Sequence, residues 1–190
     1  MSNYLKIKNY DIANGDGIGV SIFFSGCDKE PKCKGCFNSE AWPFEVGKKF
    51  NQDTIEYILE LLNNSHINHL SILGGEPLAD KNELDVLTLV KKVKEHFPNK
   101  KIWLWTWRSF ESLLISQYNM KIVGIDEFNH PEIIESRSPH EILKYIDVLV
   151  DGPFIEEEKD LKLKWKGSKN QRVIDVKKSL EKNKIELFEF

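Results

Sequence analysis

Short apolar runs that alternate with helical patterns constrain this chain more than any other feature of its sequence. Four runs have the length and composition of buried strands, at residues 20–26, 69–73, 101–107 and 146–150. Strands that alternate with helices favour a mostly parallel sheet. We therefore predict an α/β fold, a partial (incomplete) TIM-like barrel of mostly parallel strands with outer helices, formed by residues 1–190 as one domain.

The sequence also predicts where several helices begin and end. Asp53 and Glu56 form a capping pair ahead of an apolar stripe, so a helix is expected to start there. A second helical pattern reaches Phe97 and stops at Pro98, because proline cannot continue a helix. Ser138 has the features of an N-cap for a further helix, with proline next in sequence.

The remaining segments carry weaker patterns. Residues 110–114 suggest a short helix, and residues 119–138 read as a loop-rich excursion. Residues 171–176 suggest a fifth strand, and residues 184–190 an edge strand.

Composition and charge indicate which partners and which cellular compartment to expect. The formal net charge is −3 and the pI about 6.0, which does not favour nucleic acid as a partner. No run reaches the roughly 18 apolar residues of a membrane span, so no membrane partner is expected. The first residues lack the apolar core of a signal peptide. We therefore expect a cytoplasmic protein with reduced thiols.

The three cysteines of the chain, Cys27, Cys33 and Cys36, lie within ten residues. A structural zinc site or an ordinary ferredoxin cluster takes four protein ligands. Three thiolates on a 4Fe–4S cluster leave one iron open to a substrate or cofactor. The alternative is zinc held by these thiolates and a histidine, with His66 and His69 nearest in sequence, but neither completes a usual zinc spacing. We predict the cluster.

A second motif, Gly74-Gly75-Glu76-Pro77, follows the strand at residues 69–73 directly. Glycines at that point let the backbone come close to a ligand, and their carbonyls can accept hydrogen bonds from an ammonium group. The carboxylate of Glu76 can pair with the same group. The alternative is a tight strand-to-helix turn with no ligand.

Active sites of parallel α/β folds gather at the carboxyl ends of the strands. The predicted strand ends carry the cysteine loop, Gly74–Pro77, Thr106–Arg108 and Asp151-Gly152, so we expect all of them at one mouth. Asp151 either faces this mouth or caps a turn.

These motifs together resemble the radical S-adenosylmethionine superfamily, through Gly26-Cys27 to Cys36-Phe37-Asn38 and then Leu73–Pro77. Within it, the segments 146–154 and 165–176 are similar to the family that activates the anaerobic ribonucleoside-triphosphate reductase. The similarity extends from about Tyr4 to Leu180. Its most family-specific part is Gly167-Ser168 with Asn170-Gln171-Arg172.

The resemblance implies a function. A 4Fe–4S cluster on Cys27, Cys33 and Cys36 would cleave S-adenosylmethionine reductively to a 5′-deoxyadenosyl radical, which makes a glycyl radical on the reductase. Cofactor contacts would come from Gly74, Gly75, Glu76 and Asn38, with no catalytic side chain beyond the cluster and cofactor. The implied partners are the glycyl-radical subunit of the anaerobic ribonucleotide reductase and a one-electron donor such as flavodoxin.

The sequence departs from the resembled family at three places. The first cysteine gap has five residues, Asp28–Lys32, where the family usually has three. Gly19 stands where the family often has arginine, and Trp107 where it tends to have glycine. A bulky ring at Trp107 puts a cofactor role of Thr106 in doubt.

Two other functions stay open at this point. One is a different radical enzyme of the superfamily, of the pyruvate formate-lyase activase or deazaguanine synthase type. Gly35 and the segment 167–172 favour the reductase-activating family over it. The other is a non-enzymatic zinc or iron–sulfur module, in which Gly74-Gly75-Glu76 would have no role.

Overall fold

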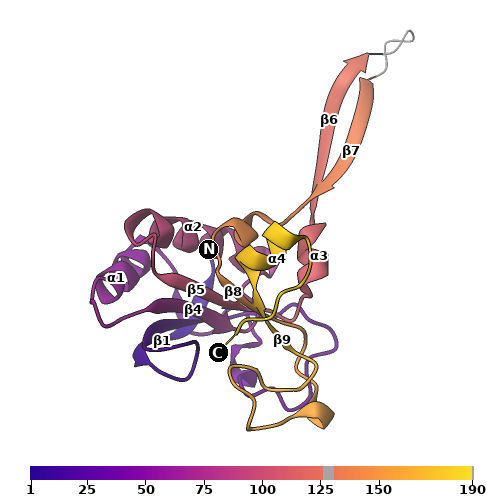
Figure 1. Ribbon diagram of the computed structural model, residues 1–190. Coiled ribbons are helices and arrows are strands. Elements are labelled where there is room, and N and C mark those ends of the chain that lie inside the picture. Colours follow the sequence, from indigo (N-terminus) through magenta and orange to yellow (C-terminus); the bar gives the residue numbers. More distant parts are fainter. Residues whose placement is uncertain (126–130, 190) are drawn as a thin grey trace.

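A seven-stranded sheet forms the centre of the molecule (Figure 1). The computed structural model describes residues 1–125 and 131–189, with the backbone alone for 117–125 and 131–138. The strands of the sheet, in spatial order, are β3 (Lys48–Lys49), β1 (Asn3–Asp11), β2 (Gly19–Phe24), β4 (His69–Gly74), β5 (Lys101–Trp105), β8 (Val148–Asp151) and β9 (Arg172–Asp175). The α-helices among the described residues are α1 (Gln52–Leu62), α2 (Asp80–His96), α3 (Phe110–Leu114) and α4 (Val176–Lys182), with 3-10 turns η1 (Ser39–Ala41), η2 (Glu141–Lys144) and η3 (Glu156–Glu158).

The core of the sheet is parallel and its margins are antiparallel. Strands β2, β4, β5 and β8 run in one direction. At one margin β1 and β3 pair antiparallel, and at the other β9 pairs antiparallel with β8. The predicted α/β class and the mostly parallel core are confirmed, whereas the partial-barrel curvature stays a prediction.

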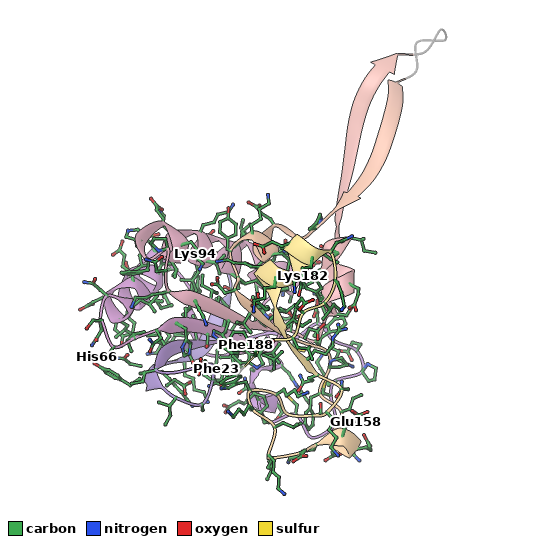
Figure 2. The ribbon with its side chains drawn as sticks, viewed as in Figure 1. Phe23, His66, Lys94, Glu158, Lys182 and Phe188 are labelled. Carbon is green, nitrogen blue, oxygen red and sulfur yellow. The ribbon has the colours of Figure 1, made fainter. Side chains whose placement is uncertain are left out.

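Strand β5 shows how the sheet separates two apolar layers. Successive side chains of a strand point to opposite faces. Ile102 and Leu104 therefore join the large core that α1 and α2 cover. Trp103 lies on the other face, packed against Trp165 at 4.8 Å and Phe188 at 5.1 Å between ring centroids. Phe188, labelled in Figure 2, lies beside β9, where its backbone nitrogen donates to Val173 O at 2.8 Å.

Helix α1 starts two residues earlier than the predicted capping pair implies. Its N-cap is Asn51, whose Oδ1 accepts a hydrogen bond from the Thr54 backbone nitrogen at 3.0 Å. The predicted capping pair Asp53–Glu56 is wrong, because Asp53 already lies inside the first helical turn. Helix α2 ends at His96, directly before Phe97-Pro98, as predicted.

Of the predicted loop-rich excursion at residues 119–138, residues 119–125 and 131–138 form strands instead, and residues 126–130 lie outside the described residues. Strands β6 (Gln117–Ile125) and β7 (Pro131–Ser138) pair antiparallel as a two-stranded ribbon that projects away from the sheet (Figure 1). Ser138 is therefore the end of a strand, and His140 caps the short turn η2 instead. The two strands are neighbours in the sequence, but the apolar pattern of this stretch did not reveal their backbone pairing.

The C-terminal strands are confirmed in part. Strand β9 occupies the predicted segment 171–176 but is followed at once by helix α4, which was not predicted. The expected edge strand at 184–190 makes one isolated bridge, Ile174 with Leu187, and Phe190 lies outside the described residues. Within residues 1–125 and 131–189, no helix combines the length and apolar character needed to cross a bilayer.

Candidate metal centre

The carboxyl ends of the parallel strands surround one cavity of about 670 Å³, counted together with its open mouth. Its walls come from the cysteine loop, the glycine turn after β4, the end of β5 and the segments after β8 and before β9. The lining residues are Cys27, Lys29, Cys33, Cys36, Phe37, Trp42, Leu73, Gly74, Gly75, Trp105, Thr106, Trp107, Gly152, Phe154 and Gln171. The prediction of a common mouth is confirmed in part: the three cysteines, Gly74, Gly75, Thr106, Trp107 and Gly152 line the cavity, whereas Glu76, Pro77, Arg108 and Asp151 do not.

All three cysteines are free, half-buried and part of this cavity wall. Cys27 comes three residues after β2, and its backbone nitrogen donates to Trp42 O at 3.0 Å. Burial raises the pKa of the Cys27 thiol. Cys36 N donates to Cys33 O at 3.3 Å, which forms a turn between these two thiols.

The cysteines share the cavity without forming a compact metal-binding group. Among the described residues, no three His, Cys, Asp or Glu side chains are arranged to hold an ion together. His66 is exposed, and buried His69 bonds through Nε2 to Asn14 O at 2.8 Å, so neither histidine lines the cavity. The donor chemistry at the cavity is thiolate alone, which fits an iron–sulfur cluster once the loop draws its thiols together.

The glycine pair after β4 lies against the strand that leads to the cysteine loop. A Cβ on Gly74 would lie 2.0 Å from Phe24 O, and one on Gly75 would lie 2.1 Å from Gly26 O. Gly75 N donates to Phe24 O at 2.8 Å, and Glu76 N to Gly26 O at 2.6 Å. The sequence predicted that these glycines let the backbone approach a ligand closely. In the structure, they also let it approach the backbone of Phe24 and Gly26 closely.

Glu76 is fully buried beneath this turn. Its Oε1 accepts hydrogen bonds from Leu78 N at 2.9 Å and Thr106 Oγ1 at 2.8 Å, and its Oε2 accepts one from Trp107 N at 3.0 Å. Burial raises the pKa of Glu76 to about 7. The side chain joins the ends of β4 and β5, a role that the sequence did not indicate.

Asn38 is buried at the start of η1, two residues after Cys36. Its Nδ2 has no hydrogen-bond acceptor among the described residues. A buried amide donor without an acceptor is costly. The residue therefore has a donor available beside the cysteine loop, although it does not line the cavity itself.

The segment 167–172 builds one rim of the cavity. Gln171 Oε1 accepts from Gly167 N at 2.8 Å and Ser168 N at 3.2 Å, while its Nε2 donates to Gly152 O at 3.0 Å. Asn170 Nδ2 donates to the carbonyl of Pro153 at 2.8 Å. The side-chain amides of Asn170 and Gln171 hold the loop after β8 against the loop before β9. This contact gives a structural reason for the motif of residues 167–172.

Asp151 caps and pairs within the protein and does not line the cavity. Its side chain is 1% exposed, and its Oδ2 accepts a hydrogen bond from Phe110 N at 2.8 Å. Arg172 Nε donates to Asp151 Oδ1 at 2.9 Å, and the same guanidinium pairs with Glu111 at 2.8 Å. The open alternatives for Asp151 are resolved in favour of the structural one.

Two of the three departures from the resembled family contact each other. Trp107 Nε1 donates to Asp28 Oδ1 at 3.0 Å, so Trp107 meets the lengthened cysteine gap. The third departure, Gly19, lies against a buried ring: a Cβ there would be 2.1 Å from His69 Nε2. Neither contact could be predicted from the sequence, because both join segments far apart in the chain.

Comparisons with known proteins identify the family of this chain. Residues 13–174 match the family model described as 4Fe-4S single cluster domain. The chain is similar to the anaerobic ribonucleoside-triphosphate reductase-activating protein of Vibrio cholerae, with 36% identity over 89% of this chain and 95% of the relative. Proteins of the same name match from Enterobacteria phage T4, with 35% identity over 90% of this chain and 92% of the relative, and from Escherichia coli K12, with 34% over 90% and 97%.

Proposed function

This chain belongs to the family of anaerobic ribonucleoside-triphosphate reductase-activating proteins with a 4Fe-4S single cluster domain, and on that premise we propose that it is a radical S-adenosylmethionine enzyme that generates a glycyl radical on that reductase. One observation carries the proposal: the three cysteines and the glycine pair Gly74-Gly75 line the same cavity. The cluster and the cofactor would then bind side by side in the same cavity.

Cys27, Cys33 and Cys36 would hold the cluster. When bound, the cluster supplies the electron that splits S-adenosylmethionine into methionine and a 5′-deoxyadenosyl radical, which takes a hydrogen atom from a glycine of the reductase. The protein contributes position and protection from water. The apolar rings of Phe37, Trp105 and Phe154 line the cavity and would exclude water from the radical.

The turn after β4 would bind the amino group of the cofactor. Gly74 and Gly75 present backbone without side chains to the cavity. Glu76 would add a negative charge behind them: Oε1 accepts two hydrogen bonds, whereas Oε2 accepts one from a described residue and retains a second lone pair. Asn38 would donate its amide hydrogen to the bound cofactor or cluster.

The partner in this proposal is the glycyl-radical subunit of the anaerobic ribonucleotide reductase, and a one-electron donor such as flavodoxin would reduce the cluster. Residues 1–190 would act as one domain, with the partial-barrel curvature and the cytoplasmic location kept as predictions from the sequence.

The test is anaerobic reconstitution with iron and sulfide, reduction in the presence of S-adenosylmethionine, and an assay for 5′-deoxyadenosine. Product that depends on the cluster is the expected result. Transfer of the radical is then measured by electron paramagnetic resonance on the added reductase. Stoichiometric zinc, no cluster and no product would contradict the proposal and favour a metal-binding module.

A further inference from the structure

The lengthened cysteine gap is tied to the end of β5 by a single side chain. Asp28 directly follows Cys27, and its carboxylate points to two donors from the segment after β5. Trp107 Nε1 donates to Oδ1 at 3.0 Å, and the Arg108 guanidinium donates to Oδ2 at 2.7 Å. Each carboxylate oxygen therefore has its own partner.

The two donors also support each other. The Arg108 guanidinium carbon lies 4.8 Å from the centre of the Trp107 ring, a stacked cation–π arrangement. Arg108 donates in addition to Leu78 O at 2.9 Å, and Trp107 N donates to buried Glu76. The group is thus anchored in the network beneath the glycine turn.

This ion pair lies at the surface, but its two side chains are only partly exposed. The side chains of Arg108 and Asp28 are 23% and 32% exposed. Charge-assisted hydrogen bonds of this kind are shorter and stronger than neutral ones, and partial burial reduces their screening by water. The other ion pair from the loop to a different segment, Lys34 with Glu156, has a lysine side chain that is 82% exposed.

We propose that Asp28, Trp107 and Arg108 form a latch that keeps Cys27 in place while the rest of the cysteine loop closes on the metal. A longer loop costs more entropy to order. With Asp28 held, only four residues, Lys29–Lys32, stay free before Cys33. The latch thus joins the two extra loop residues and the bulky Trp107, two departures from the resembled family, into one device.

The latch also shapes the cofactor space, because Trp107 is part of the cavity wall. Holding its indole through Asp28 fixes that wall. This second role rests on the proposed function, whereas the retention of Cys27 does not require it. Asp28, Trp107 and Arg108 are positioning residues in both roles.

Thiol labelling of the metal-free protein tests the latch, since the only cysteines in the chain are the three in this loop. The reagent is 5,5′-dithiobis(2-nitrobenzoate), and mass spectrometry assigns the rate to each cysteine. Asp28→Ala and Trp107→Phe are each expected to raise the rate at Cys27 about fivefold or more, because local opening becomes easier. The double variant is expected to be no faster than the faster single one.

Glu30→Ala is the matched control. Its carboxylate is lost from the same loop, but its ion pair is with Lys32 of that loop. We expect wild-type labelling of Cys27 in this variant. Asp28→Asn keeps an acceptor for the indole N–H and should restore part of the protection. Equal rates for Asp28→Ala and Glu30→Ala, or effects that multiply in the double variant, would overturn the latch.

The loaded enzyme separates the latch from the proposed function. Reconstituted Trp107→Phe is expected to raise KM for S-adenosylmethionine about threefold or more with kcat retained, because a wall of the binding space has loosened. An unchanged KM would overturn the second role. If the wild type makes no 5′-deoxyadenosine at all, the proposed function fails, and the labelling at Cys27 still decides the latch. Should Asp28→Ala unfold and label all three thiols together, Trp107→Phe and Asp28→Asn decide it.

Discussion

Thr106 Oγ1 donates a 2.8 Å hydrogen bond to Glu76 Oε1 across the ends of two neighbouring parallel strands. The threonine does not act alone, since Arg108 N donates to the same hydroxyl at 3.1 Å. The Thr106 hydroxyl therefore has a structural role: it links Glu76 to the backbone of Arg108. Glu76 serves as the junction between the glycine turn and the latch.

Glu76 is expected to make the stability of the metal-free protein depend on pH. Burial raises its pKa from 4.5 to about 7, so the folded protein holds a proton there that the unfolded chain has lost. Stability should fall as pH rises from about 5 to 7, by an amount on the order of 3 kcal/mol, and level off above. Urea denaturation at each pH measures it.

Glu76→Gln is the comparison for that experiment, because an amide has no proton to lose in this range. The difference in unfolding free energy between wild type and variant should change across pH 5 to 7. A constant difference would show that Glu76 does not titrate there.

Each of the three cysteines should be required for the cluster. Alanine at Cys27, Cys33 or Cys36 leaves two thiolates, which cannot hold a stable site-differentiated cluster. Iron and sulfide content per chain after reconstitution is expected to drop severalfold, and 5′-deoxyadenosine formation to be lost. Full cleavage activity in any one variant would remove that residue from the ligand set.

Gly75 and Gly152, two of the glycines that line the cavity, should respond differently to alanine. A Cβ on Gly75 meets the Gly26 backbone at 2.1 Å, so Gly75→Ala must displace one strand end, at a cost of about 3 kcal/mol. Gly152→Ala has room, since its nearest atom is 3.7 Å away, but its φ of +94° is strained for alanine, at about 1 kcal/mol. Thermal and urea denaturation compare the two, and equal losses would refute the steric argument.

Arg172→Ala should be strongly destabilising. It removes the partner of Asp151, a carboxylate that is 1% exposed, and an unpaired buried charge costs about 3 kcal/mol or more. Lys92→Ala is the control: its pair with Glu95 is exposed, so its loss should change stability little. Similar unfolding free energies for the two variants would contradict the assigned role of Arg172.

Local chemistry let the sequence alone determine much of this protein. Apolar runs predicted the four parallel strands, since burial on both faces requires them, and glycines and cysteines at strand ends predicted the common cavity. These features depend on residues that are close together in the chain, so they can be recognised in the sequence.

Tertiary structure alone decided how those pieces engage. The bonds from Thr106 and Trp107 to Glu76, the pairing of Asp151 with Arg172 and the contact of Asp28 with Trp107 join residues separated by 21 to 79 positions. The antiparallel pairing of β9 with β8 has the same character. Such contacts depend on which segments the folded sheet brings together, and no local pattern of residues specifies that.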